Sequence, residues 1–261
     1  MRLSLLFVAL LPVLMLGGCS LLPEQIDETA DWSASEFHAN AKEALADSEY
    51  ERALELYGKL EARYPYGPYA EQAQLETAYA HYKANEPEAA VAAAERFIKL
   101  HPRHSSVDYA YYLRGLASFK VGGGLLDSIA PPEPEKHDPA GARRAFGYFR
   151  ELVERFPNSR YSGDAKQRMT FLRNLLARHE LHVADQYYRR GAWLAAVNRA
   201  RYVLENYRQT PAVADALALM VRGYRQLEMP QLAADTLRIL QLNYADHPAL
   251  QQLQTSLPSP P

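Results

Sequence analysis

The side chains of this chain that could perform chemistry are few, and its 8 histidines come first. His179 and His182 stand three residues apart in the segment HELH, which is not the HExxH pattern of zinc enzymes and lacks an obvious third ligand. His101 and His104 flank a proline, without acidic residues that would converge on them. The glycines at 122–124 follow no predicted strand and precede no Lys-Ser or Lys-Thr pair, so they do not form a phosphate-binding loop. No GxSxG segment offers a nucleophilic serine, and we expect a protein without catalytic residues, metal ions or cofactors.

Composition excludes further classes. A single cysteine forms neither an internal disulfide nor a CxxC redox pair. The 29 basic and 31 acidic residues nearly cancel, which gives no electrostatic reason to expect nucleic acid as a partner. With 48% hydrophobic and 23% charged residues, the 261-residue chain has the composition of a globular protein with a sizeable core.

The one cysteine, Cys19, lies at the end of a short apolar leader. Arg2 precedes an apolar run over residues 3–16, which is too short for a helix that spans a bilayer and is typical of a signal peptide, residues 1–18. The segment LGGC ending at Cys19 resembles the bacterial lipobox, which implies cleavage before this residue and acylation of its thiol and new amine. Several acyl chains make a permanent membrane anchor. Ser20 in place of Asp favours the outer membrane, with the protein on the inner leaflet facing the periplasm. The alternative is an ordinary secretory peptide with an incidental cysteine.

A tyrosine-rich turn is the first candidate for binding. Tyr64, Tyr66 and Tyr69 lie within residues 63–69, where two prolines limit the motion of the backbone. Rigid aromatic side chains beside a groove bind apolar peptide segments at a low cost in entropy. The alternative is a turn between two helices whose tyrosines pack into the core, which we expect most for Tyr64.

A basic strip is the second candidate. Arg190 and Arg199 lie in a stretch that runs from residue 189 to residue 199, and arginine favours paired hydrogen bonds with a partner's carboxylate. The alternative is ordinary solvated surface charge. Residues 20–108 carry 8 basic and 17 acidic residues, whereas residues 109–261 carry 20 and 14. Opposite charges on the two halves suit two different partners.

These candidates must be positioned by helices. Apolar residues recur at helical spacing along the chain, as at Tyr50, Ala53, Tyr57 and Leu60, and no segment shows the alternation of a strand. Prolines such as Pro87 stand where helices are expected to begin. The fold class that we predict is therefore all-α.

The helices form repeats. Small residues mark the expected crossing points of five helix pairs, and apolar residues of various sizes follow four and seven positions later. The crossing residues are Ala53, Ala90, Ala145, Ala196 and Ala233. This pattern resembles the tetratricopeptide repeat and predicts an α-solenoid of about five such helix pairs, or about ten helices.

The repeats set the domain boundaries. We expect a lipidated N-terminus and tether over 19–33, three N-terminal repeats over 34–157 with an insertion at 121–138, and two C-terminal repeats over 158–250. A longer helix near 161–190 is expected to couple the third and fourth repeats, and residues 251–261 are expected to form a flexible tail.

Several stretches resemble the BamD family, formerly called ComL, over essentially the whole mature chain. They are RYPYGPYAEQAQL (63–75), RFIKLHP (96–102), DYAYYLRGL (108–116), FPNSRY (156–161) and GAWLAAVN (191–198). The sequence departs from the family mainly in the tether, the insertion and the proline-rich end.

This resemblance implies a non-catalytic lipoprotein of the outer-membrane β-barrel assembly machinery. Its C-terminal repeats would hold the barrel-forming subunit BamA, with Arg190 and Arg199 as candidate contacts. Its N-terminal repeats would receive the targeting signals of unfolded outer-membrane proteins, with Tyr64, Tyr66 and Tyr69 on that side, and accessory lipoproteins of the complex would be further partners. Two alternatives are another repeat lipoprotein that serves peptidoglycan or pilus factors, and an anchored hydrolase for which no nucleophile–base pair is found.

Overall fold

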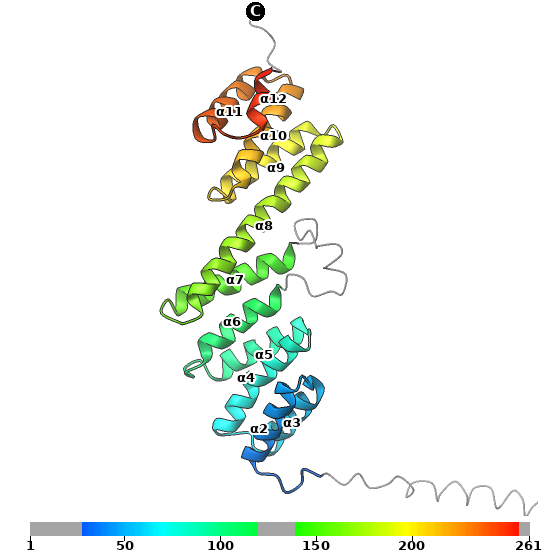
Figure 1. The fold of residues 1–261 in the computed structure, drawn as a ribbon, viewed down its shortest axis with the longest axis vertical. Coiled ribbons are helices and arrows are strands. Elements are labelled where there is room, and N and C mark those ends of the chain that lie inside the picture. Colours follow the sequence, from blue (N-terminus) through cyan, green and yellow to red (C-terminus); the bar gives the residue numbers. More distant parts are fainter. Residues whose placement is uncertain (1–27, 120–138, 256–261) are drawn as a thin grey trace, which may run out of the picture.

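The computed structural model describes residues 28–119 and 139–255, which form eleven helices and no strand (Figure 1). The leader with Cys19, the insertion and the last six residues lie outside the described residues. The helices are α2 (Ala34–Ala46), α3 (Tyr50–Arg63), α4 (Pro68–Lys83), α5 (Pro87–Leu100), α6 (Val107–Ser118), α7 (Ala140–Arg155), α8 (Ser162–Arg189), α9 (Trp193–Asn206), α10 (Ala212–Gln226), α11 (Pro230–Asn243) and α12 (Ala249–Thr255).

The first ten of these helices pair in chain order, and the pairs stack along the long axis of the molecule (Figure 1). Each even-numbered helix from α2 to α10 is the first of its pair, and the next helix is the second. The prediction of an all-α solenoid with five tetratricopeptide-like pairs is therefore confirmed. Among the first helices, α2 contacts α4, α4 contacts α6, and α8 contacts α10, which also contacts α12.

The predicted repeat register is also confirmed by burial. All fifteen aligned positions are at most 5% exposed: Ala53, Tyr57 and Leu60; Ala90, Ala94 and Phe97; Ala145, Phe149 and Leu152; Ala196, Ala200 and Val203; Ala233, Leu237 and Leu240. A small residue at the crossing lets two helix backbones approach, and the apolar residues one and two turns later fill the space between pairs.

One glycine shows how closely the helices approach. A Cβ atom at Gly115 of α6 would lie 2.5 Å from the ring of Phe149 on α7, so that only glycine leaves room for this ring. Gly115 thus has a packing reason in the first helix of the third repeat.

The turn inside a repeat has the same backbone geometry in four repeats. One residue adopts the left-handed conformation five positions before the crossing alanine: Ser48 (φ 67°), Asn85 (φ 63°), Gly191 (φ 76°) and Glu228 (φ 56°). The N–H of the following residue then closes the helix end, as from Ala192 to the carbonyl of Tyr187 at 3.0 Å. In the third repeat, the residue five positions before Ala145 is Ala140, which begins α7.

The long helix α8 joins the two halves, as predicted from the sequence. Its N-terminal part, including Leu172 and Leu175, packs in the core of the third repeat, and its C-terminal part, including Ala177 and Ala184, packs in the core of the fourth. The hydrophobic core therefore continues across the boundary expected at residues 157–158.

Two boundary predictions are corrected by the structure. Residues 249–255 form α12, and Leu250 and Leu253 are 7% and 3% exposed against the last repeat, so the flexible tail expected from residue 251 does not begin there. These two leucines cover the apolar end of the stack, which a solenoid must protect from water. At the other end, Trp32 packs edge-on against Phe37 at 5.3 Å, so the tether expected to run to residue 33 ends earlier.

Candidate partner-binding surfaces

The tyrosine-rich turn joins α3 to α4, and its three tyrosines lie in different environments. Tyr64 is half-buried against the core of the first repeat; its hydroxyl donates to the carbonyl of Trp32 at 2.8 Å. Tyr66 is 91% exposed. Tyr69 is 39% exposed, and its ring lies 5.5 Å from that of His38. Tyr66 and Tyr69 are therefore accessible, whereas Tyr64 holds the segment before α2 to the turn.

The position of Tyr64 recurs in every repeat. A half-buried aromatic ring follows the last residue of each second helix, eleven residues after the crossing alanine: Tyr64, His101, Phe156, Tyr207 and Tyr244. Each backbone N–H at this position closes its helix. The constant spacing of these rings is present in the sequence. Their recurrence at the same half-buried position indicates that the ring of Tyr64 has a packing role.

A groove lies beside this turn on the first helices. A cavity of about 530 Å³ is lined by α2, α4 and α6, with Leu45, Leu75, Tyr79 and Tyr109 among its residues. A second cavity of about 680 Å³ shares Leu75 and Tyr109 and continues to Tyr161, just before α8. We call these two cavities the N-terminal groove. Pro68 also lines the first cavity, which places Tyr69 at the rim of the groove.

Tyrosines dominate the far part of this groove. The rings of Tyr112 and Tyr161 stack at 4.9 Å, and Tyr109 lies 5.3 Å from Tyr161. Burial, with the neighbouring phenols, raises the pKa of Tyr109 well above its ordinary range, so the hydroxyl keeps its proton. The groove therefore offers flat apolar rings with neutral hydroxyls, which suits the backbone and aromatic side chains of a peptide.

These groove tyrosines are not among the binding residues predicted from the sequence. Tyr79 and Tyr82, and likewise Tyr109 and Tyr112, are three residues apart, which places each pair on one face of a helix. That spacing could have indicated a tyrosine-lined face. Which face remains open is decided by the packing of the neighbouring repeats.

A carboxylate beside the groove shows how its floor is fixed. Asp164 of α8 accepts a hydrogen bond from Tyr112 and pairs with Arg168, each at 2.5 Å. Burial raises the pKa of Asp164, but these two partners lower it more, so the pKa is below its ordinary value. The stacked tyrosines are thus anchored to α8 by an ionised group.

The two arginines of the predicted basic strip differ in their surroundings. Arg190 is the exposed residue that ends α8. Arg199 of α9 pairs with Glu180 of α8 at 2.8 Å, and Arg143 of α7 pairs with the other oxygen of Glu180 at 3.2 Å. The side chain of Glu180 is 2% exposed, whereas that of Arg199 is 39% exposed. Arg199 therefore neutralises a buried carboxylate of its own chain and presents only part of its guanidinium to a partner.

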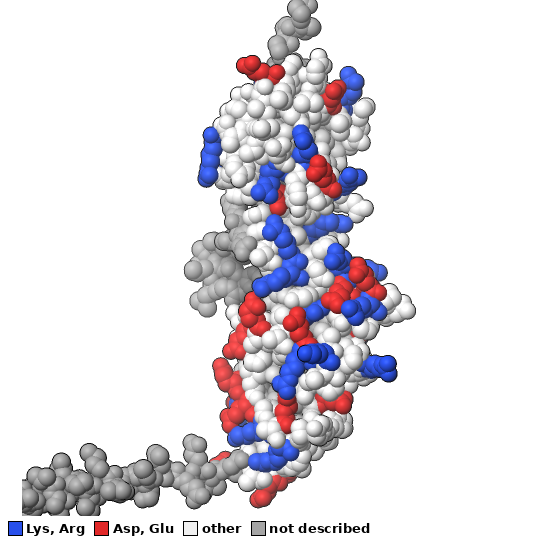
Figure 2. Space-filling view, turned by 180° about the vertical axis from the view of Figure 1, so that it is seen from behind, with Lys and Arg blue, Asp and Glu red and all other residues white. Residues whose placement is uncertain are grey.

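Charge is divided between the halves on the surface as well. Figure 2 shows Lys and Arg gathered over the middle of the molecule and Asp and Glu prominent along the N-terminal repeats below it. Part of the basic excess is paired within the chain, as between Arg144 of α7 and Glu88 of α5 at 3.1 Å. Arg189 and Arg190 are exposed on the C-terminal half, and we call them the basic surface.

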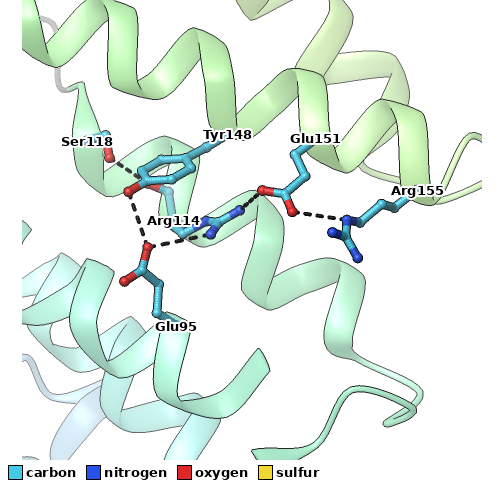
Figure 3. A network of polar contacts seen from close by, with 6 residues as sticks. All are labelled: Glu95, Arg114, Ser118, Tyr148, Glu151 and Arg155. Carbon is cyan, nitrogen blue, oxygen red and sulfur yellow. Dashed lines mark hydrogen bonds and ion pairs between the residues drawn. The ribbon is translucent and has the colours of Figure 1, made fainter. Parts of the chain in front are cut away.

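A polar network fixes the third repeat between these regions (Figure 3). Arg114 of α6 is 8% exposed and pairs with Glu95 of α5 and with Glu151 of α7. Its guanidinium lies 4.0 Å from the ring centre of Tyr148, whose hydroxyl donates to Glu95 at 3.2 Å. Arg155 completes the network by pairing with Glu151 at 3.0 Å. One buried cation thus joins three helices and makes this part of the solenoid rigid.

His101 and His104 have ordinary structural contacts. His101 and Gln74 are hydrogen-bonded at 2.9 Å, and the rings of His101 and His104 pack against Phe97. Within residues 28–119 and 139–255, no three His, Cys, Asp or Glu side chains are grouped so that they could hold a metal ion. In the same part of the chain, no helix combines the length and apolar character needed to cross a membrane.

Comparison with known proteins agrees with this architecture. The profile of the family described as "YfiO: Outer membrane lipoprotein" matches residues 30–240. The outer membrane protein assembly factor BamD of Neisseria gonorrhoeae is 45% identical over 222 residues, which cover 85% of this chain and 83% of that protein. BamD of Vibrio cholerae is 36% identical over 234 residues, which cover 90% and 96%.

Similarity to solved structures is weaker. The pilus biogenesis factor PilW is 14% identical, covers 85% of this chain and 98% of its own, and has a TM-score of 0.36, which supports no argument about function. The match of sequence to a lipoprotein family is much stronger, because it extends over most of the chain at high identity. This chain belongs to the YfiO/BamD family of outer membrane lipoproteins.

Proposed function

We propose that this chain is a non-catalytic scaffold of outer-membrane protein assembly. In this proposal Cys19 carries the lipid that anchors the chain to the inner leaflet of the outer membrane, facing the periplasm. The C-terminal repeats hold a BamA-like barrel-forming subunit, accessory lipoproteins bind elsewhere, and the N-terminal groove receives unfolded β-barrel proteins. No cofactor takes part.

The observation that carries the proposal is the separation of two unlike surfaces on one rod. The tyrosine-lined N-terminal groove lies on acidic repeats, and the basic surface lies on the C-terminal repeats. Helix α8 packs in the cores of both the third and the fourth repeat and so joins the two halves. A scaffold requires such an arrangement, because two partners must bind at once and at a fixed distance. The family assignment supplies the context of outer-membrane assembly.

The N-terminal part is tested with a synthetic peptide that corresponds to the C-terminal segment of an unfolded outer-membrane β-barrel protein. A photo-crosslinker at Gln72, an exposed residue of the groove, should form an adduct, whereas one at exposed Arg238 of α11 should not. Tyr66→Ala should reduce the adduct if the exposed turn extends the groove, and Tyr202→Ala on α9 serves as the matched control because it removes another exposed ring. Equal adducts at both crosslinker positions would remove this part of the proposal.

The C-terminal part is tested by co-purification with the barrel-forming subunit. Arg190→Glu reverses an exposed charge at the end of α8 and should weaken the complex, because the basic surface then carries a carboxylate. Arg103→Glu, an equal change on an exposed turn of the N-terminal half, should leave the complex intact. If both variants co-purify like the wild type, Arg190 is not a contact.

The role in the cell is tested by depletion. Loss of this chain should lower the amounts of β-barrel proteins in the outer membrane. Normal levels would instead favour a lipoprotein that serves peptidoglycan or pilus factors.

A further inference from the structure

The C-terminal repeats contain a second hollow that the proposed function does not use. It has a volume of about 570 Å³ and lies between α8, α10 and α12. The short helix α12 takes the place that the first helix of a sixth repeat would occupy, so it forms one wall of this hollow. We call it the C-terminal groove.

The floor of the C-terminal groove is apolar. Leu181 of α8, Ala218 and Leu219 of α10, and Leu253 of α12 line it. A volume of this size lies within the range of about 300–1,000 Å³ found for binding pockets, enough for a few side chains of a partner. Side chains of three helices therefore form an apolar seat.

The charged groups around this seat have hydrogen-bond or ion-pair partners within the chain, with one exception. Asp185 pairs with Arg189 at 2.7 Å, Asp215 pairs with His247 at 3.1 Å, and Arg225 donates to the carbonyl of Leu253 at 2.6 Å. The last two contacts hold α12 and the turn before it against α10 and fix the shape of the groove.

The exception is Arg222. Its guanidinium is exposed and lies 5.1 Å from the ring centre of Tyr188, and within residues 28–119 and 139–255 it forms no ion pair with a carboxylate. The aromatic ring restrains the side chain beside the apolar floor. A cation that is held in place and has no counter-charge is ready to accept a carboxylate, because little rotamer entropy remains to be lost on binding.

We propose that the C-terminal groove binds a segment of a protein partner that carries an Asp or Glu next to aliphatic side chains. The carboxylate would pair with Arg222, and the aliphatic groups would fill the floor formed by Leu181 and Leu219. Charge complementarity favours this occupant over a basic or purely apolar segment. The inference concerns a different surface from the N-terminal groove, so either can be wrong while the other holds.

The test uses the full lipid-anchored chain in detergent micelles and a displayed library of peptides about 12 residues long. Peptides selected on the wild type should be enriched in an acidic residue flanked by Leu, Ile or Val. Arg222→Glu should weaken their binding about tenfold or more, since a charge-assisted hydrogen bond is lost and a repulsion is added. Arg222→Gln should weaken it less, and replacement of the peptide's acid by its amide should have an effect similar to that of Arg222→Gln.

Two controls make the result decisive. Arg238→Glu reverses an exposed charge on α11 outside the groove and should leave the affinity unchanged. A Tyr66→Ala variant should also bind the selected peptides normally, which separates this groove from the N-terminal surface. The proposal is overturned if the selected peptides show no acidic enrichment, or if Arg222→Glu and Arg238→Glu bind them equally well.

Discussion

Removal of the positive charge from Arg199 should destabilise the fold through Glu180. This carboxylate is 2% exposed and has two cationic partners, Arg199 at 2.8 Å and Arg143 at 3.2 Å. Removing one partner of a buried ion pair costs about 3–5 kcal/mol when nothing compensates. Because Arg143 remains and Arg199 is partly solvated, we expect about 2 kcal/mol for Arg199→Gln.

The assay is chemical and thermal unfolding of the lipid-free chain. For a chain of this size about 2 kcal/mol corresponds to a loss of about 4–8 °C in Tm. Glu180→Gln removes the buried charge that Arg199 neutralises, so Arg199→Gln should cost at least about 1 kcal/mol less in the Glu180→Gln background. A coupling energy near zero would refute the reasoning, since the two side chains would then act independently.

The same variants separate structure from partner binding. If Arg199→Gln loses the barrel-forming subunit and the double variant with Glu180→Gln regains it, the loss came from the uncompensated carboxylate. If both variants lose it, Arg199 itself contacts the partner. Comparison of the single and double variants therefore separates a structural role of Arg199 from a direct contact with the partner.

Three further predictions follow from local geometry. Glu228→Gly should raise the free energy of unfolding by about 1 kcal/mol in denaturant titrations, because Glu228 holds a left-handed conformation (φ 56°) that glycine adopts without strain. Gly115→Ala should lower it by about 1–3 kcal/mol, because the added methyl would lie 2.5 Å from the ring of Phe149; an unchanged unfolding midpoint would show that the ring moves freely. Burial, followed by the charge of Glu76 and the hydrogen bond to it, raises the pKa of the Tyr57 hydroxyl far above its ordinary 10.0. As the pH rises above 10.0, the unfolded chain therefore loses this proton before the folded chain does, and the free energy of unfolding falls. Tyr57→Phe should make that alkaline fall shallower by up to about 1.4 kcal/mol per pH unit, and an equal slope would exclude Tyr57 as its source.

The repeat register was readable from the sequence because it depends on residue size at fixed spacing. A buried crossing position such as Ala53 or Ala196 accepts only a small residue, and the positions four and seven residues later must be apolar. The long helix α8 was likewise indicated by the wider spacing between the third and fourth repeats. The end of the array was misread, because the two buried leucines of α12 form too short a pattern beside a proline-rich end.

The candidate sites, like the fold, could be predicted only in part from the sequence. The types of residue in the tyrosine-rich turn and the basic strip suggested binding, but the sequence does not specify which way a side chain points. The constant spacing of Tyr64 with Phe156 and Tyr244 shows that an aromatic ring ends each second helix, and this became visible only once the helix ends were known. Arg199 was selected for its charge, and its counter-charge lies on another helix.

The sequence by itself determined the class of fold and the number and register of the repeats, because these follow from contacts that are local along the chain; from a local motif it also predicts lipid attachment at Cys19. Only the tertiary structure decided which tyrosines line a groove, that Arg143 and Arg199 pair with Glu180, and that Arg222 lies beside the C-terminal groove without a carboxylate partner within the described residues. Those properties depend on side chains brought together from different repeats. Their distances are set by the superhelical stacking of the pairs, and no spacing within one repeat encodes that stacking.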